Sequence, residues 1–123
     1  MERQPVYVIL GGSGGIGSAV ARNLASAGAK VALAARGAER LEELAAELGD
    51  ATIGVVDATD VSAVEDFVRS TADTEGGVDG IVNCVGSILL KAAHQTTEDE
   101  WQRTIATNLD SAFATVRAGA KVM

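Results

Sequence analysis

Apolar and polar residues follow one another in a regular order along the chain, and their spacing predicts four strands separated by helices. Helical spacing places Leu41, Leu44 and Leu48 on one face of a helix over 38–48. Strands that alternate with helices of this length form right-handed βαβ units on a parallel sheet. The pattern therefore predicts an α/β fold. The apolar runs that are typical of its buried strands lie at 6–10, 30–35, 52–56 and 80–85.

The expected helices carry start and stop signals. Gly28 and Gly49 follow the last apolar residues of the first two helices, where a C-terminal glycine is common. Asp60 is a suitable N-cap for a third helix. The run Thr97-Glu98-Asp99-Glu100 resembles a capping box and opens a long helix over 97–118. We expect Trp101 to anchor this long helix to the sheet.

A glycine-rich stretch, Leu10-Gly11-Gly12-Ser13-Gly14-Gly15-Ile16-Gly17, lies between the first strand and the first helix. Glycine permits a positive φ and lets a phosphate approach the backbone closely. The free N–H groups at the start of the following helix attract an anion. The context favours a nucleotide pyrophosphate site over an ordinary flexible turn. The residues expected to form it are Gly11, Ser13, Gly14, Gly15, Ile16 and Gly17.

This stretch also sets the expected topology. A glycine turn of this kind lies at the switch point of a doubly wound sheet, so we expect the strand order 3-2-1-4. That order is the first half of a Rossmann-like fold, and 123 residues suffice for one domain.

The amino-acid composition limits the kinds of partner that we expect this chain to bind. The formal net charge is −7 and no basic run is present, which argues against nucleic acid and anionic membranes as partners. No apolar segment approaches the roughly 20 residues that span a bilayer, and we expect a cytoplasmic protein. We interpret Cys84 as a small buried hydrophobic residue. His94 has no partners at metal-ligand spacing, so we predict a solvated side chain and no metal site.

Four motifs occur in the order found in one enzyme family. They are Gly11-x-x-x-Gly15-x-Gly17, Asp57-Ala58 after the third strand, Asn83-Cys84-Val85-Gly86 at the fourth, and Asn108 in the long helix. Together they resemble the short-chain dehydrogenase/reductase family from about Val6 to Met123. The family usually has Thr where this chain has Leu10, which removes a hydroxyl that braces the turn.

The resemblance implies roles for the later motifs. Asp57 and Ala58 would bound the adenine, and Asn83 and Gly86 the ribose beside the nicotinamide. Asn108 would be the asparagine of the family's catalytic tetrad, whose main-chain carbonyl holds a water. Asparagine is a poor residue in the middle of a helix, so Asn108 predicts a local kink there. Structural alternatives remain open: Asp57 as the cap of a turn, Asn83 as a core amide that ties adjacent strands, and Asn108 as a tolerated polar residue on the helix surface.

The cofactor preference depends on the end of the second strand. A site that prefers NAD needs an acidic residue there to bind the ribose 2′-hydroxyl. This chain has Ala34-Ala35-Arg36 instead, and an arginine pairs with a 2′-phosphate. The sequence therefore favours NADP over NAD. Arg40 either assists or is a solvated charge.

The resemblance also implies an activity. Residues 1–123 would be the N-terminal part of an NAD(P)-binding domain whose parent transfers hydride between the cofactor and a carbonyl or alcohol substrate. The family's Ser and Tyr-x-x-x-Lys motif lie beyond a fifth strand, and Tyr7, the only tyrosine, has no lysine four residues later. We therefore expect this chain alone to be inactive, and the full-length form to be a homo-oligomer. The alternative is a non-catalytic nucleotide-binding or regulatory module.

Overall fold

The computed structural model describes residues 3–123, and its centre is a four-stranded parallel sheet. The strand order is β3-β2-β1-β4, which confirms the predicted topology. The register places Leu10, at the end of β1, between Ala34 of β2 and Asn83 of β4. The carboxyl ends of three strands therefore meet beside the glycine turn. The strands are β1 (Val6–Leu10), β2 (Lys30–Ala35), β3 (Ala51–Val55) and β4 (Gly80–Asn83).

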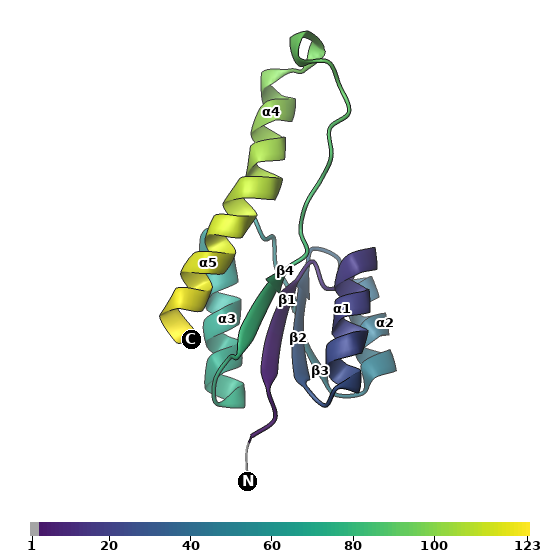
Figure 1. The fold of residues 1–123 in the computed structure, drawn as a ribbon, viewed down its shortest axis with the longest axis vertical. Coiled ribbons are helices and arrows are strands. Elements are labelled where there is room, and N and C mark those ends of the chain that lie inside the picture. Colours follow the sequence, from purple (N-terminus) through teal and green to yellow (C-terminus); the bar gives the residue numbers. More distant parts are fainter. Residues whose placement is uncertain (1–2) are drawn as a thin grey trace.

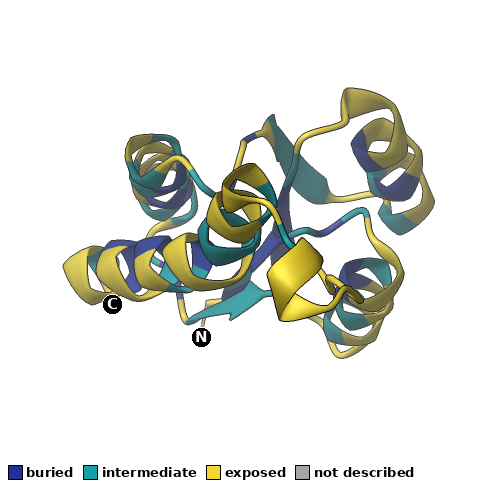
Figure 2. Ribbon diagram, turned by 90° about the horizontal axis from the view of Figure 1, so that it is seen from above, coloured by how far each residue is buried: buried dark blue, intermediate teal, exposed yellow. Residues whose placement is uncertain are grey.

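Helices cover both faces of this sheet (Figure 1). Helices α1 and α2 lie on one face, and α3 and α5 lie on the other. Ile9 and Leu33 are fully buried beneath α1 and α2, and Val8 and Leu10 are fully buried on the opposite face. Figure 2 shows the helix surfaces exposed around the sheet, whose central strands β1 and β2 are mostly buried and whose edge strands β3 and β4 are mostly half-buried. The helices are α1 (Gly15–Ser26), α2 (Ala38–Leu48), α3 (Val61–Glu75), α4 (Glu98–Ile105) and α5 (Ser111–Val122).

Most predicted boundaries agree with the structure, and the helix signals act as expected. The side chain of Asp60 accepts a hydrogen bond from the N–H of Ala63 at the start of α3. Strand β3 lies one residue earlier than predicted. Strand β4 ends at Asn83, two residues earlier than predicted, because Asn83 Oδ1 accepts the N–H of Val85 at 3.0 Å and turns the chain off the ladder.

The predicted long helix is interrupted. A π-turn, η2 (Ala106–Asp110), joins α4 to α5, so the irregularity expected at Asn108 is present. Asn108 Nδ2 donates to the carbonyl of Thr104 at 2.9 Å, and a side chain that competes for backbone acceptors favours such a turn.

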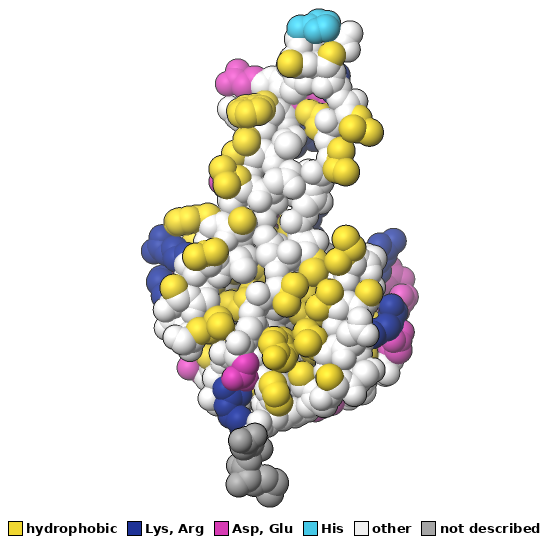
Figure 3. All heavy atoms as spheres, in the orientation of Figure 1, with side chains coloured by type: hydrophobic (Ala, Val, Ile, Leu, Met, Phe, Trp, Pro, Cys, Tyr) yellow, Lys and Arg dark blue, Asp and Glu magenta, His cyan; other side chains and the backbone are white. Residues whose placement is uncertain are grey.

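Residues 86–105, called the arm below, project past the carboxyl ends of the strands (Figure 1). The arm consists of a loop, the 3-10 turn η1 (Ala93–Gln95) and α4. Trp101 is 60% exposed there, so the prediction that it anchors the helix to the sheet is wrong. The reason is positional: α4 extends beyond the sheet, and only α5 packs on β4. Hydrophobic side chains remain at the surface along the arm (Figure 3).

Within residues 3–123, no helix is both long enough and apolar enough to cross a membrane. The same residues contain no group of three or more His, Cys, Asp or Glu side chains placed to hold a metal ion.

Candidate dinucleotide-binding cleft

The glycine turn is attached to the end of β2 by its first two amides. The N–H groups of Gly11 and Gly12 both donate to the carbonyl of Ala34, at 2.8 and 3.1 Å. Gly11 has a φ of +73°, a conformation that side chains disfavour. The turn therefore lies at the carboxyl edge of the sheet, directly before α1.

Two glycines of the turn are sterically required. A Cβ on Gly11 would lie 3.0 Å from the carbonyl carbon of Cys84, and a Cβ on Gly17 would overlap the carbonyl of Gly11. A Cβ on Gly15 would meet no atom within 4 Å. Gly11 and Gly17 thus allow close backbone packing, whereas Gly15 leaves open space above the turn.

The turn also presents unused hydrogen-bond donors. The first amide of α1 with a backbone acceptor is that of Ser18, which donates to the carbonyl of Gly14 at 2.8 Å. Among the residues that the structure describes, the N–H groups of Ser13, Gly15, Ile16 and Gly17 have no such acceptor. Four unpaired donors at a helix N-terminus form a site for an anion such as a phosphate.

A cleft of about 220 Å³ opens beside the turn, at the carboxyl ends of the strands. It combines residues from five separate segments: the end of β1 with the glycine turn, the end of β2, the β3–α3 loop, the loop after β4, and η2. The predicted site residues that line it are Gly11, Gly14, Arg36, Asp57, Ala58 and Gly86. Ser13 and Gly15 line a neighbouring hollow together with Arg40.

Asp57 is held in a local turn as well as lining the cleft. Its Oδ1 accepts the N–H of Thr59 at 2.9 Å and the hydroxyl of Thr59 at 2.8 Å. These two bonds, with a smaller contribution from the Arg36 guanidinium, lower the pKa of Asp57 below its usual value. The carboxylate is therefore an ionised, preorganised acceptor, and the structural alternative of a turn cap also applies.

Arg36 is exposed at the end of β2, between two hollows. It lines the cleft described above and also a larger hollow of about 490 Å³ beneath the arm. Ala34 and Ala35, which precede it, line the cleft without adding a charge. Asp57 is the single acidic residue among those that line the cleft.

Asn83 does not line this cleft, and its amide is used internally. Nδ2 donates to the hydroxyl of Ser111 at 3.3 Å, and that hydroxyl donates to the carbonyl of Thr107 at 2.6 Å. Oδ1 accepts the N–H of Val85. Asn83 therefore ties the end of β4 to the η2–α5 junction, not to an adjacent strand.

Asn108 joins the helix to the loop after β4. Its Oδ1 accepts the N–H of Ser87 at 3.0 Å, and its Nδ2 donates to the Ser87 hydroxyl at 3.2 Å. A Cβ on Gly86 would lie 3.2 Å from the same Oδ1, so Gly86 leaves room for this contact. The side chain of Asn108 is thus engaged, and it positions the loop that borders the cleft.

The structure adds contributors that sequence reasoning missed. Thr59 and Thr107 line the cleft, and Ser87 is the partner of Asn108. Thr107 follows Arg103 and Thr104 at helical spacing, and this polar face, which continues from α4 into η2, is a signal that could have indicated it.

Cys84 also lines the cleft and is half-buried. Burial raises the pKa of its thiol and so favours the neutral form, which is the form expected of a small hydrophobic side chain. His94 is exposed in η1 at the end of the arm, as predicted.

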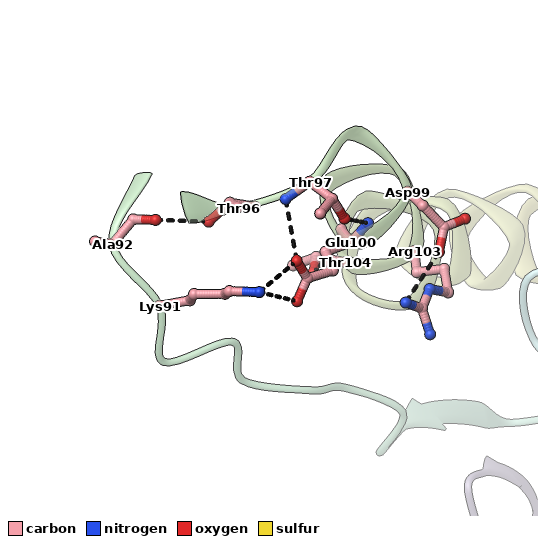
Figure 4. A network of polar contacts seen from close by, with 8 residues as sticks. All are labelled: Lys91, Ala92, Thr96, Thr97, Asp99, Glu100, Arg103 and Thr104. Atoms are coloured by element: carbon pink, nitrogen blue, oxygen red, sulfur yellow. Dashed lines mark hydrogen bonds and ion pairs between the residues drawn. The ribbon is translucent and has the colours of Figure 1, made fainter. Parts of the chain in front are cut away.

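The outer part of the arm, beside η1, is held by a charged network (Figure 4). Lys91 Nζ lies 2.8 and 3.1 Å from the two carboxylate oxygens of Glu100. The N–H of Thr97 donates to Glu100 Oε1, and the N–H of Glu100 donates to the Thr97 hydroxyl, which completes the predicted capping box. Lys91 and then the Thr97 N–H lower the pKa of Glu100 to about 2.

Comparisons with known proteins agree with this geometry. The family model for short chain dehydrogenases matches residues 5–123. A glycine betaine reductase of Emericella nidulans is 41% identical over 107 residues, which are 84% of this chain and 8% of that protein. An uncharacterized oxidoreductase of Staphylococcus aureus strain MW2 is 33% identical over 120 residues, which are 96% of this chain and 52% of that protein.

Solved structures give the same result. A short-chain dehydrogenase/reductase from Serratia marcescens matches with a TM-score of 0.92 and 31% identity over 98% of this chain and 51% of its own. An alcohol dehydrogenase from the archaeon Thermococcus sibiricus, complexed with 5-hydroxy-NADP, matches with a TM-score of 0.90 and 34% identity over 97% of this chain and 53% of its own.

The chain thus spans about half the length of these dehydrogenases and of the Staphylococcus relative. A family match over residues 5–123 coincides with the glycine turn, the strand order and the cleft found in the structure. This chain belongs to the short-chain dehydrogenase/reductase family.

Proposed function

We propose that residues 1–123 form the cofactor-binding part of an NADP-dependent short-chain dehydrogenase/reductase. The cofactor, when bound, supplies the hydride that passes to or from a small carbonyl or alcohol substrate. The chain's own part is to bind and orient the dinucleotide. Its catalytic partner residues, the Tyr and Lys of the family's Tyr-x-x-x-Lys motif, are not among the residues of this chain.

The glycine turn fits a pyrophosphate on two independent grounds. The amides of Ser13, Gly15, Ile16 and Gly17 are unpaired within residues 3–123 and supply donors where an anion would lie. Gly15 leaves the space above the turn open. Ile16, 75% exposed despite its apolar side chain, gains a hydrophobic contact if a ligand covers the turn.

The adenosine end has matching acceptors and donors. The Asp57 carboxylate is fixed by Thr59 and faces the same cleft as Ala58, which suits the amino edge of an adenine. The observation that carries the NADP preference is Arg36 at the end of β2, preceded by Ala35 where a carboxylate would repel a 2′-phosphate.

The nicotinamide end would border Gly86, with Asn83 and Asn108 behind it. Both amides are bound internally, to Ser111 and Ser87 respectively. We assign them as positioning residues for the loop after β4. The tetrad role that the family implies for Asn108 would then be carried by its main-chain carbonyl in the π-turn.

The NADP assignment is tested by calorimetric titration of the purified protein with NADP⁺ and NAD⁺. Arg36→Ala should weaken NADP⁺ by about 1–3 kcal/mol and leave NAD⁺ nearly unchanged, because a charge-assisted contact is lost. Ala35→Asp should invert the preference. Equal losses for both dinucleotides in Arg36→Ala would overturn the assignment.

An oligomer is supported by one face of the helix around η2. Leu109, Phe113 and Val116 lie at i, i+4 and i+7 and are 60%, 56% and 71% exposed. We propose that a second copy covers this face in the full-length enzyme. Sedimentation of the Phe113→Asp variant should give a smaller particle than the wild type.

The alternative is a non-catalytic nucleotide-binding module that uses the same cleft. Such a module would use the amides of the glycine turn and the cleft beside it in the same way. NADPH oxidation in the presence of carbonyl substrates by the protein with its downstream residues separates the two functions. Turnover supports the reductase, and tight binding without turnover supports the module.

A further inference from the structure

Within residues 3–123, two polar residues are buried: Thr71 on α3 and Ser111 at the start of α5. Each hydroxyl donates to the carbonyl four residues earlier, at 2.9 Å for Thr71 and 2.6 Å for Ser111. Such a bond satisfies a buried donor within its own helical segment. The Ser111 hydroxyl has a second bond, because it accepts Nδ2 of Asn83, at the end of β4, at 3.3 Å. Ser111 therefore connects two elements, whereas Thr71 is satisfied within one.

The Ser111 side chain also takes over a backbone bond that the π-turn displaces. In a regular α-helix, the N–H of Ser111 would donate to the carbonyl of Thr107, four residues earlier. In η2 this N–H donates to the carbonyl of Ala106 instead. The hydroxyl of Ser111 donates to the Thr107 carbonyl in its place. One side chain thus supports the π-turn and attaches it to β4.

These bonds connect two walls of the cleft from behind. At one end, Thr107 lines the cleft from η2. At the other end, Asn83 Oδ1 accepts the N–H of Val85 at 3.0 Å, and Val85 lines the cleft next to Gly86. The two middle members, Asn83 and Ser111, are not among the residues that line it. We call this chain of bonds, which runs behind the cleft from Thr107 to Val85, the relay.

A second contact joins the same two segments, but it is exposed. Asn108 bonds Ser87 through both atoms of its amide, and both residues lie at the surface. Water competes for hydrogen bonds there. Ser111 is fully buried, where a hydrogen bond is stronger and the loss of one partner costs more. The relay is therefore the firmer of the two connections between η2 and the loop after β4.

We propose that Ser111 is a positioning residue for the cofactor, because its hydroxyl fixes η2 and the loop after β4 at the separation that a dinucleotide needs. The inference rests on the proposed function. Ser111 acts through Asn83 and Thr107 and lies outside the cleft, so it affects how well the cleft is preorganised and not which dinucleotide is preferred. In this respect it differs from Arg36.

The test compares the two buried hydroxyls. Ser111→Ala and Thr71→Val each remove one of them, and both should lower the midpoint of urea unfolding. In calorimetric titration of the purified protein, Ser111→Ala should weaken NADP⁺ and NAD⁺ by the same factor, roughly 5- to 10-fold. Thr71→Val should weaken either dinucleotide by less than about 2-fold. An unchanged affinity in Ser111→Ala, or an equal loss in Thr71→Val, would overturn the proposal.

Hydrogen exchange followed by NMR tests the relay without any cofactor. The N–H of Val85 should exchange faster in Ser111→Ala than in the wild type, because Asn83 then lacks one of its two partners. The N–H of Ala63, which Asp60 holds at the start of α3, is the control and should not change. A Val85 N–H whose exchange is the same in both proteins would contradict the relay.

A double variant tests whether Ser111 acts through Asn83. Asn83→Ala breaks the relay, so the addition of Ser111→Ala should cause no further loss of dinucleotide affinity. Losses that add in the double variant would overturn the proposal and leave the dinucleotide function standing. Failure of the wild type to bind either dinucleotide would instead overturn the proposed function.

Discussion

The sheet and the arm use the same kinds of apolar residue in opposite ways. In the sheet, Ile9 and Leu33 are fully buried between β1, β2 and their covering helices. On the arm, Ile88 and Leu90 are 84% and 93% exposed, and ion pairs and a helix cap hold the chain in place. The sheet is therefore specified by its own packing. The arm carries apolar surface that its own contacts do not bury, which is typical of a segment whose purpose is a ligand or a partner.

This difference in packing bears on where a dinucleotide would bind. The glycine turn is rigid because it is anchored to the sheet through Ala34 and packed against Cys84. The arm joins the sheet through the loop after β4 and through η2, where Asn108 bonds Ser87. A rigid phosphate site next to a less buried arm is a suitable arrangement for a cleft that must admit a long dinucleotide.

The largest expected effect comes from adding a side chain to the glycine turn, which is anchored to the sheet. Gly11→Val should destabilise the fold by about 4 kcal/mol and abolish dinucleotide binding, because positive φ and close packing both oppose a β-branched side chain. Urea unfolding and calorimetric titration measure the two effects. Gly15→Ala, which adds a Cβ in open space, is the control and should leave stability within about 0.5 kcal/mol. A folded Gly11→Val variant with unchanged affinity would refute the phosphate site.

A leucine pair tests the contrast in packing directly. Leu33→Ala should cost about 3 kcal/mol, since a fully buried side chain leaves a cavity, whereas Leu90→Ala should cost less than about 0.5 kcal/mol. Both are measured by urea unfolding of the same preparation. Comparable losses for the two variants would mean that the arm is as tightly packed as the sheet.

The smallest effect concerns the arm alone and depends on pH. The folded pKa of Glu100, about 2, lies below its ordinary value of 4.5, so its stabilising contribution is complete above 4.5 and is lost as the pH falls toward 2. Limited proteolysis of the arm should therefore accelerate over that window. In Glu100→Gln the arm should be cleaved faster at neutral pH and respond less to acid, and Glu42→Gln on α2 should behave as the wild type. A Glu100 carboxyl that titrates near 4.5 by NMR would contradict this account.

The sheet could be predicted because each of its signals is local. The apolar runs, the helix caps at Asp60 and Thr97 and the glycine turn each act within a few residues, and their order along the chain fixes the topology. The carboxyl ends of adjacent parallel strands meet, so Arg36, Asp57 and Gly86 could be expected to line one cleft.

Features that depend on distant contacts could not be predicted in this way. The alternative role of Asn83, a core amide that ties adjacent strands, fails because its partner is Ser111, 28 residues away on another element. The prediction for Trp101 is wrong for the same reason, since helical spacing shows that a face is apolar but not what covers it. The hollow between Arg36 and Arg103 likewise arises only from the way the arm folds back.

The most direct measurement is a crystal structure of the protein with NADP⁺. The account predicts the pyrophosphate at the amides of Ser13, Gly15, Ile16 and Gly17, the adenine beside Asp57, and the 2′-phosphate within hydrogen-bond distance of Arg36. A dinucleotide whose phosphates lie away from the glycine turn, or whose 2′-phosphate points away from Arg36 into solvent, would contradict it.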